Sequence, residues 1–399
     1  MPSNKETYKN FINRGAFYAV NTILQFFAIS LISHQLTLKE RGTYILIISI
    51  LPATSSILSL GLTNIIPAST NGCLTRLPIA IQKTFIKIIL PTIAPIPVLS
   101  IYFSFTKDTV SFLFLQILVL NIAFNTRLLL LGSLTAQSKT TIEIIITTFT
   151  SGTFLTTLFI TSKYTTLTIQ SCINILIASH FLYILIAAVT TRKQLQSYSN
   201  QHKHTFPFRM GLRSTAHVIL TTSKTRIDLL LVSFLALPET IGLYSALTTM
   251  SQLSNAPSTA IGQVLLAKSA TEKGTNKYFP IKVSIFIAIA IIAGSTIVIF
   301  LGETFWILTF GAQYTDISKT FPYYVIFITA SAASNTLSYW QSGKGFPQSL
   351  LAASLASILI TITAGPIMYN FFEINGLCLA IGIAALIGVV IQTRHITKA

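Results

Sequence analysis

Twelve apolar runs, each about 20 residues long, occupy most of this sequence and constrain its fold more than any other feature. A helix needs about 20 apolar residues to cross the roughly 30 Å of hydrocarbon in a bilayer. The runs cover residues 11–33, 43–66, 86–105, 110–133, 142–161, 168–190, 214–236, 240–266, 280–301, 321–340, 348–370 and 376–393. We therefore expect an all-α integral membrane protein with about 12 transmembrane helices.

The composition agrees with a membrane protein and excludes a soluble globule. Hydrophobic residues make up 52% of the 399 residues, charged residues make up 9%, and the mean hydropathy is +0.69. A soluble domain would have about a quarter of its residues charged. No small-residue cleavage site follows the first apolar run, so we expect that run to remain in the bundle rather than to be removed as a signal peptide.

The net charge of +17 does not indicate a nucleic-acid partner, because its distribution follows the positive-inside rule. With a cytoplasmic N-terminus, 19 of the 27 lysine and arginine residues fall on cytoplasmic segments and five on outside loops. The remaining three, Arg127, Lys224 and Arg226, lie within membrane spans. The segments expected in the cytoplasm are both termini and the loops at 71–85, 191–213 and 267–279.

The stretch from Arg213 to Tyr244 is expected to begin with a membrane-spanning helix that carries charge at its middle. An ionised side chain at the bilayer centre costs about 2.5–3.5 kcal/mol on insertion scales, and three occur here within five residues. A projection at about 100° per residue gives one polar stripe, which consists of Arg213, His217, Thr221, Lys224 and Asp228. Arg226 points to nearly the opposite side. Two interpretations stay open: a functional polar cavity, or a structural Lys224–Asp228 pair with a snorkelling Arg226.

Four other expected helices carry polar side chains at helical spacing, and the tenth has Ser331, Asn335, Ser338 and Ser342. The first has Arg14, Tyr18, Asn21 and Gln25. The fourth has Asn121 and Asn125 on one face, with Arg127 toward the inner leaflet. The eighth has Ser245, Thr248, Gln252, Asn255, Thr259 and Gln263, with a kink expected at Pro257. Such stripes either line water-filled space or join helices by hydrogen bonds, and Arg127 can also snorkel to the cytoplasm, so these alternatives stay open.

The sequence repeats itself at an offset of about 200 residues. SHQLTLKERGTY ends in Gly42-x-Tyr44, and SFLALPETIGLY ends in Gly242-x-Tyr244. Further weak matches keep the same order, among them Gly61 with Gly262. Six helices in each half make the repeat parallel, so we expect two lobes, 1–200 and 201–399, related by an axis along the membrane normal.

Several diffuse motifs carry a resemblance that covers essentially the whole chain. They are Asp228 followed by Gly242-x-Tyr244-Ser245-Ala246, then Phe310-Gly311 with Tyr314, and Asn375-Gly376-Leu377 with Ala380. In these motifs the chain resembles the polysaccharide-biosynthesis branch (O-antigen flippases, Wzx-like) of the multidrug/oligosaccharidyl-lipid/polysaccharide exporter superfamily. It departs from the family pattern at Glu373-Ile374, where the family more often has an aromatic residue and a glycine.

The resemblance implies a fold and a function. The fold is two six-helix lobes around a central cleft, which the first and seventh helices line. The function is movement of an undecaprenyl-diphosphate-linked oligosaccharide across the bacterial inner membrane by alternating access, for O-antigen and lipopolysaccharide biosynthesis. Membrane lipids, a polysaccharide polymerase and a chain-length regulator are the implied partners.

We expect Lys224 and Arg226 to attract the lipid diphosphate into the cleft, with Asp228 holding Lys224 in place. The candidate substrate-binding residues are Arg14, Asn21, Gln25, Arg127, Lys224, Arg226, Asp228, Gln252 and Asn255.

Two other classes of protein compete with this interpretation. A cation-coupled drug exporter of the same superfamily needs acidic residues deep in its lobes, whereas the charges in the middle of the seventh span are two basic and one acidic. A membrane enzyme needs acid, base or metal groups on sizeable loops, and the largest outside loop is only 302–320. Three scattered cysteines give neither a disulfide framework nor a metal pattern. We therefore expect a transporter without a cofactor or metal site rather than an enzyme.

Overall fold

The computed structural model describes residues 4–58, 108–136, 140–196, 220, 223–224, 226–271, 278–343 and 348–398. These residues form helices and short connections, and no strand occurs among them. The α-helices are α1 Asn4–Gln35, α2 Leu38–Leu58, α6 Asp108–Ala136, α7 Thr140–Tyr164, α8 Ile169–Gln196, α10 Ile227–Leu235, α11 Pro238–Thr271, α12 Tyr278–Phe310, α13 Ile317–Gly343 and α14 Gln348–Lys398, and a 3₁₀ helix, η2, spans Ala312–Tyr314.

The expected spans that fall in these ranges are helical, with one interruption at Arg226. Four helical segments in the described ranges are both long and apolar enough to cross a membrane: Ile142–Tyr164, Ile169–Thr190, Tyr278–Phe310 and Gln348–Thr397. α1, α11 and α13 are longer than 20 residues but carry polar stripes that lower their hydropathy. The expected span at 86–105 lies outside the described residues, so the number of twelve helices stays a prediction.

The chain forms two compact units. The first consists of residues 1–46 and 220–399, and it contains α1, the first turns of α2, and α10 to α14. The second consists of residues 47–219, and it contains the rest of α2 with α6, α7 and α8. In the first unit α1 packs against α11 and α12 of the C-terminal half. The lobe boundary at residue 200 stays a prediction.

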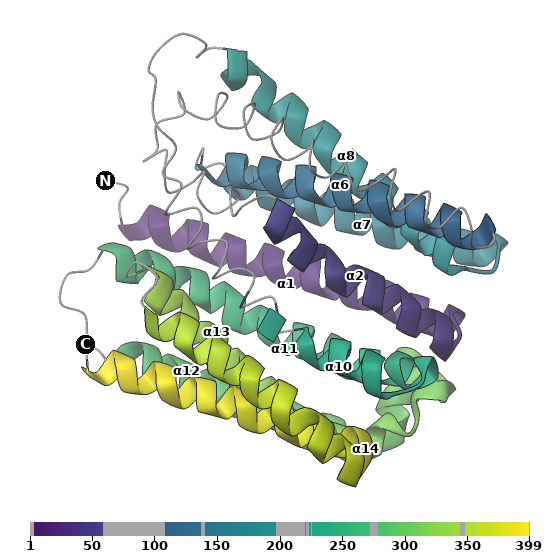
Figure 1. Cartoon of the computed structure of the whole chain (residues 1–399). Helices are drawn as coiled ribbons and strands as arrows, with labels where there is room; N and C mark the ends of the chain where they lie inside the picture. The colour runs from purple at the N-terminus through teal and green to yellow at the C-terminus, as the bar shows by residue number, and fades with distance from the viewer. Residues whose placement is uncertain are drawn as a thin grey trace. The chain divides into compact units, whose positions relative to one another are not determined.

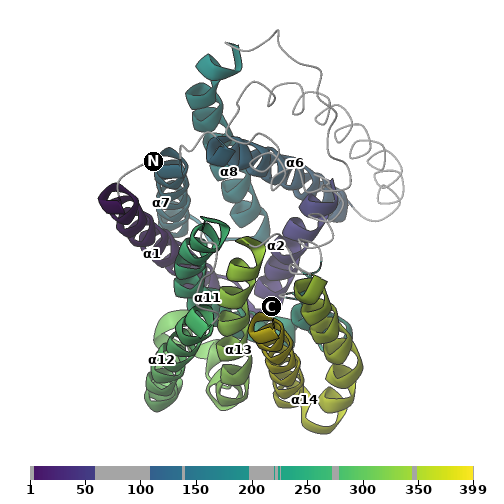
Figure 2. The same cartoon turned by 90° about the vertical axis from the view of Figure 1, so that its left-hand side faces the viewer.

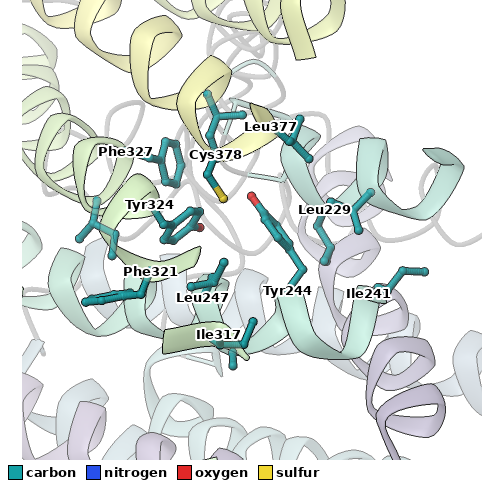
Figure 3. Close-up of a cluster of buried hydrophobic side chains, with 14 of the residues drawn as sticks. Leu229, Ile241, Tyr244, Leu247, Ile317, Phe321, Tyr324, Phe327, Leu377 and Cys378 are labelled. Atoms are coloured by element: carbon teal, nitrogen blue, oxygen red, sulfur yellow. The ribbon is translucent and has the colours of Figure 1, made fainter. Parts of the chain in front are cut away.

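The first unit is built around α13. This helix packs against α11, α12 and α14, and Figures 1 and 2 show α11, α13 and α14 next to one another. Tyr324 of α13 and Tyr244 of α11 lie edge to face with ring centroids 5.8 Å apart, and both are fully buried. Figure 3 shows them close to Leu247 and Cys378 in one core. Burial of these aromatic rings stabilises the contact between helices through packing.

Polar contacts join the end of α1 to the segment after α12. Gln313 Nε2 donates to the carbonyl oxygens of Ser33 at 2.9 Å and Leu36 at 3.0 Å. Gly311 has φ +106°, and a Cβ there would lie 3.3 Å from His34 Nδ1. Burial raises the pKa of the neighbouring Tyr314 phenol above its ordinary value. Residues 302–320, which were expected to form an outside loop, thus contain the last turns of α12, the 3₁₀ helix η2 and the start of α13. Gln313 in this segment binds the end of α1.

Candidate functional site

The helix expected across 214–236 is interrupted, and the prediction of one continuous helix is wrong. Arg226 has φ −132° and ψ −7°, and α10 begins only at the next residue. The Arg226 amide bonds to the Ser223 carbonyl at 3.1 Å in a turn, while the Leu230 amide bonds to the Arg226 carbonyl at 3.1 Å and continues into α10. A projection at about 100° per residue assumes one helix axis, so it does not hold across this turn.

The three charges around the turn have separate partners. With the Gln252 amide in the orientation that satisfies both groups, its oxygen accepts from Arg226 Nη1 at 3.0 Å and Nη2 at 3.2 Å. Asp228 is buried and accepts from the Tyr244 hydroxyl at 2.9 Å and the Leu229 amide at 2.7 Å. Lys224 Nζ donates to Ser334 Oγ of α13 at 2.8 Å.

The expected Lys224–Asp228 pair is not formed in the described part of the chain, and that prediction is wrong. A Cβ at Gly388 of α14 would lie 3.6 Å from Lys224 Nζ, so the ammonium group points toward α13 and α14. Lys224 therefore binds Ser334 of α13 and does not pair with Asp228.

A cavity of about 330 Å³ lies next to Arg226 within the first unit. α1, α11 and α13 supply its other walls. Its lining residues are Asn21, Thr22, Gln25, Arg226, Thr248, Ser251, Gln252, Asn255, Ala256, Thr259, Tyr324, Phe327 and Ser331. Among these described lining residues Arg226 is the charged one, and no carboxylate accompanies it.

The amide and hydroxyl groups of α11 and α13 form both the wall and the contact between these helices. Asn255 Nδ2 donates to Ser331 Oγ at 3.4 Å and lies 3.5 Å from Ser251 Oγ. One turn further along each helix, Asn335 Nδ2 donates to Ser258 Oγ at 3.0 Å and Thr259 Oγ1 at 3.1 Å. The polar stripe of α11 therefore both lines the cavity and packs against α13, so both interpretations from the sequence hold.

Five of the nine candidate residues lie around this one cavity. They are Asn21, Gln25, Arg226, Gln252 and Asn255. Lys224 and Asp228 are not in its lining, the side chain of Arg14 lies outside the described residues, and Arg127 belongs to the other unit. In that unit Arg127 Nη1 donates to His180 Nδ1 at 3.2 Å, and its guanidinium lies 4.8 Å from the centre of the Tyr183 ring.

Sequence reasoning missed other lining residues as candidates. Ser331 lies at the start of a hydroxyl and amide stripe on α13, with Asn335 and Ser338, and that stripe was the available signal. Tyr324 and Phe327 gave no signal, because aromatic residues in an apolar span are equally expected in the core.

Comparison with known proteins supports a transporter fold. No family model matches the sequence, and no curated protein sequence matches it. Among solved structures, the chain is similar to the inward-facing conformation of a multidrug resistance MATE family transporter of the MOP superfamily. That match has a TM-score of 0.73 and 12% identity, and it covers 97% of each chain.

Two further structures complete the comparison. The outward-facing conformation of a multidrug resistance MATE family transporter matches with a TM-score of 0.69 and 13% identity, over 98% of this chain and 96% of that chain. The lipid II flippase MurJ, in an inward closed conformation, matches with a TM-score of 0.66 and 16% identity, over 96% of this chain and 87% of that chain. The chain thus has the fold of these MATE transporter structures and of the flippase MurJ.

Proposed function

We propose that this protein is a lipid-linked oligosaccharide flippase. Its substrate is an undecaprenyl-diphosphate-linked repeat unit of O-antigen or a related polysaccharide, which it moves across the plasma membrane by alternating access. The similarity to MurJ, which is a lipid II flippase, and to MATE transporters supports a transported substrate.

The charge of the cavity is the observation that carries the proposal. A guanidinium group has five N–H donors, and among the described residues the Gln252 oxygen accepts from two of them, so the others can bind a ligand. A diphosphate cannot leave water unless fixed donors replace its hydration, and a guanidinium suits phosphate oxygens in geometry and charge. Arg226 at the cavity wall is therefore the residue that we assign to the diphosphate.

The rival function is cation-coupled export of small molecules, and the similarity to multidrug resistance MATE transporters supports export. Its supporting observation is Asp228, a buried carboxylate in the same unit. Asp228 already accepts hydrogen bonds from Tyr244 and the Leu229 amide, and it is absent from the described lining of the cavity. A cationic drug in this cavity would meet Arg226 instead of a carboxylate, so we favour the anionic substrate.

The location of the protein follows from the same proposal. We place it in the bacterial inner membrane with both termini in the cytoplasm, near a polysaccharide polymerase and a chain-length regulator. A reporter that is active only outside the cell should be inactive when fused after Lys203. Activity of that fusion would contradict the orientation and the lobe assignment.

Replacement of Arg226 tests the function directly. In a strain without its own flippase, the wild type should restore surface polysaccharide and Arg226→Ala should restore little, at equal membrane abundance. Arg226→Lys keeps the charge without the planar fork, and we expect it to retain much of the transport. Lys319→Ala removes a charge from a side chain that is 75% exposed and serves as the control. Full transport by Arg226→Ala would overturn the proposal.

A further inference from the structure

We propose that Gln252 is a positioning residue, which fixes the Arg226 guanidinium at the cavity wall without cancelling its charge. This inference rests on the proposed function, because it concerns the residue that we assign to the diphosphate. Gln252 acts through Arg226 and is not itself the group that binds the phosphate oxygens. The neutrality of its amide is therefore essential, and an acidic side chain of the same size would not replace it.

Gln252 binds one edge of the guanidinium. Its oxygen accepts from Arg226 Nη1 at 3.0 Å and from Nη2 at 3.2 Å, so it lies between these two atoms. The other edge, which Nε and one Nη form, can bind two phosphate oxygens at once. Both side chains line the cavity, so the guanidinium is held beside the space that a ligand would occupy.

The contact also orders a flexible side chain before the substrate binds. Gln252 belongs to α11 and Arg226 to the turn before α10, so the hydrogen bonds join this turn to a second helix. An arginine side chain has many rotamers, and holding it in one of them costs entropy. A guanidinium that is already ordered in the free protein binds a ligand more tightly than one that the ligand has to order.

The neighbouring carboxylate is held by other partners, which leaves the charge of Arg226 for the substrate. Asp228 is two residues further along the chain, and it accepts from the Tyr244 hydroxyl and the Leu229 amide. No ion pair joins it to Arg226 within the part of the chain that the structure describes. The change Gln252→Glu would keep an acceptor for the same two N–H groups, but the resulting pair would be neutral. The amide thus gives the geometry of an ion pair and leaves the positive charge in place.

Binding of undecaprenyl diphosphate to the purified full-length protein in lipid nanodiscs tests this role. We expect Gln252→Glu to weaken binding at least about tenfold, because its carboxylate neutralises the guanidinium and repels the diphosphate. The melting temperature of this variant should equal or exceed that of the wild type, because a carboxylate accepts from a guanidinium more strongly than an amide does. If Gln252 had only a structural role, a variant that keeps these hydrogen bonds would bind the carrier as the wild type does.

A matched variant controls for the added negative charge. Gln348 is the first residue of α14, and its side chain is exposed and absent from the described lining of the cavity. Gln348→Glu makes the same chemical change there, and it should bind undecaprenyl diphosphate with the affinity of the wild type.

A double-mutant cycle tests whether Gln252 acts through Arg226. Gln252→Leu removes the acceptor, and we expect it to weaken carrier binding about fivefold when Arg226 is present. In the Arg226→Met background it should cause no further loss, because no guanidinium remains to be positioned. This comparison does not depend on the stability of Gln252→Glu.

The outcomes separate this inference from the proposed function. Wild-type affinity in Gln252→Glu, or an equal loss from Gln252→Leu in both backgrounds, would overturn the inference, while weak binding by Arg226→Met still supported a flippase. Absence of carrier binding in the wild type, or full binding by Arg226→Met, would overturn the proposed function and this inference together.

Discussion

Gly42 and Gly242 make reciprocal contacts with the backbone of each other's segment. A Cβ at Gly242 would lie 2.0 Å from the carbonyl oxygen of Leu38, and a Cβ at Gly42 would lie 2.6 Å from that of Pro238. Gly42 and Gly242 are 200 residues apart, as are Leu38 and Pro238. Reciprocal contacts of this kind are what a two-fold relation produces. The packing therefore agrees with the internal repeat and brings the first turns of α2 and α11 to backbone distance.

Replacement of Gly242 by alanine should lower the melting temperature of the purified protein. The new methyl group would overlap a backbone carbonyl that cannot rotate away, and overpacking of this kind costs about 1–3 kcal/mol. Gly294→Ala in α12 is the matched control, because nothing lies within 4 Å of a Cβ at that position. Equal melting temperatures for the two variants in one detergent would contradict the close approach of α2 and α11.

The backbone at Glu373 predicts a stabilising substitution. Glu373 has φ +51° and ψ −136°, close to the φ +54° and ψ −135° of Gly302, and each residue interrupts a helix. Glycine adopts this region readily, whereas other residues pay about 1–3 kcal/mol for such strained conformations. Glu373→Gly should therefore raise the melting temperature, and Gly302→Ala should lower it. A Glu373→Gly variant less stable than the wild type would show that contacts of the Glu373 side chain outweigh the strain.

In the described ranges the helices could be predicted because apolar length is a local property, and the polar stripe of α11 could also be identified from the sequence. The turn at Arg226 could not be predicted, because no proline or glycine marks it within residues 221–230. The projection separated Arg226 from Lys224 and Asp228, as the structure does, but it wrongly paired Lys224 with Asp228. Their actual partners, Gln252, Ser334 and Tyr244, come from other helices, which a single-helix projection does not include. The departure from the family's aromatic–glycine pair at Glu373-Ile374 was visible in the sequence, but the positive φ of Glu373 was not.

The position of Lys224 predicts that stability and transport respond differently to its removal. Lys224→Met keeps the length of the side chain and removes the bond to Ser334, so it should alter the melting temperature. Because Lys224 is not in the described lining of the cavity, we expect most of the transport to remain, measured as surface polysaccharide at equal membrane abundance. Arg226→Met is the comparison, and it should lose transport. Loss of transport in Lys224→Met to the same extent would indicate that Lys224 contributes to the field around the substrate.

Two neighbouring positions on α13 test whether the cavity is accessible to water. Ser331 lines the cavity, whereas Ala332 is fully buried against other helices. In a background without the native Cys73, Cys172 and Cys378, Ser331→Cys should react with a small hydrophilic thiol reagent at least about tenfold faster than Ala332→Cys, because modification requires an accessible thiolate. The rates are measured in permeabilised cells, so that either side of the membrane can admit the reagent. Undecaprenyl diphosphate should slow the reaction at Ser331→Cys if it occupies the cavity. Complete protection of Ser331→Cys without any ligand would mean that α1, α11 and α13 pack without water between them, and it would remove the basis for a substrate site there.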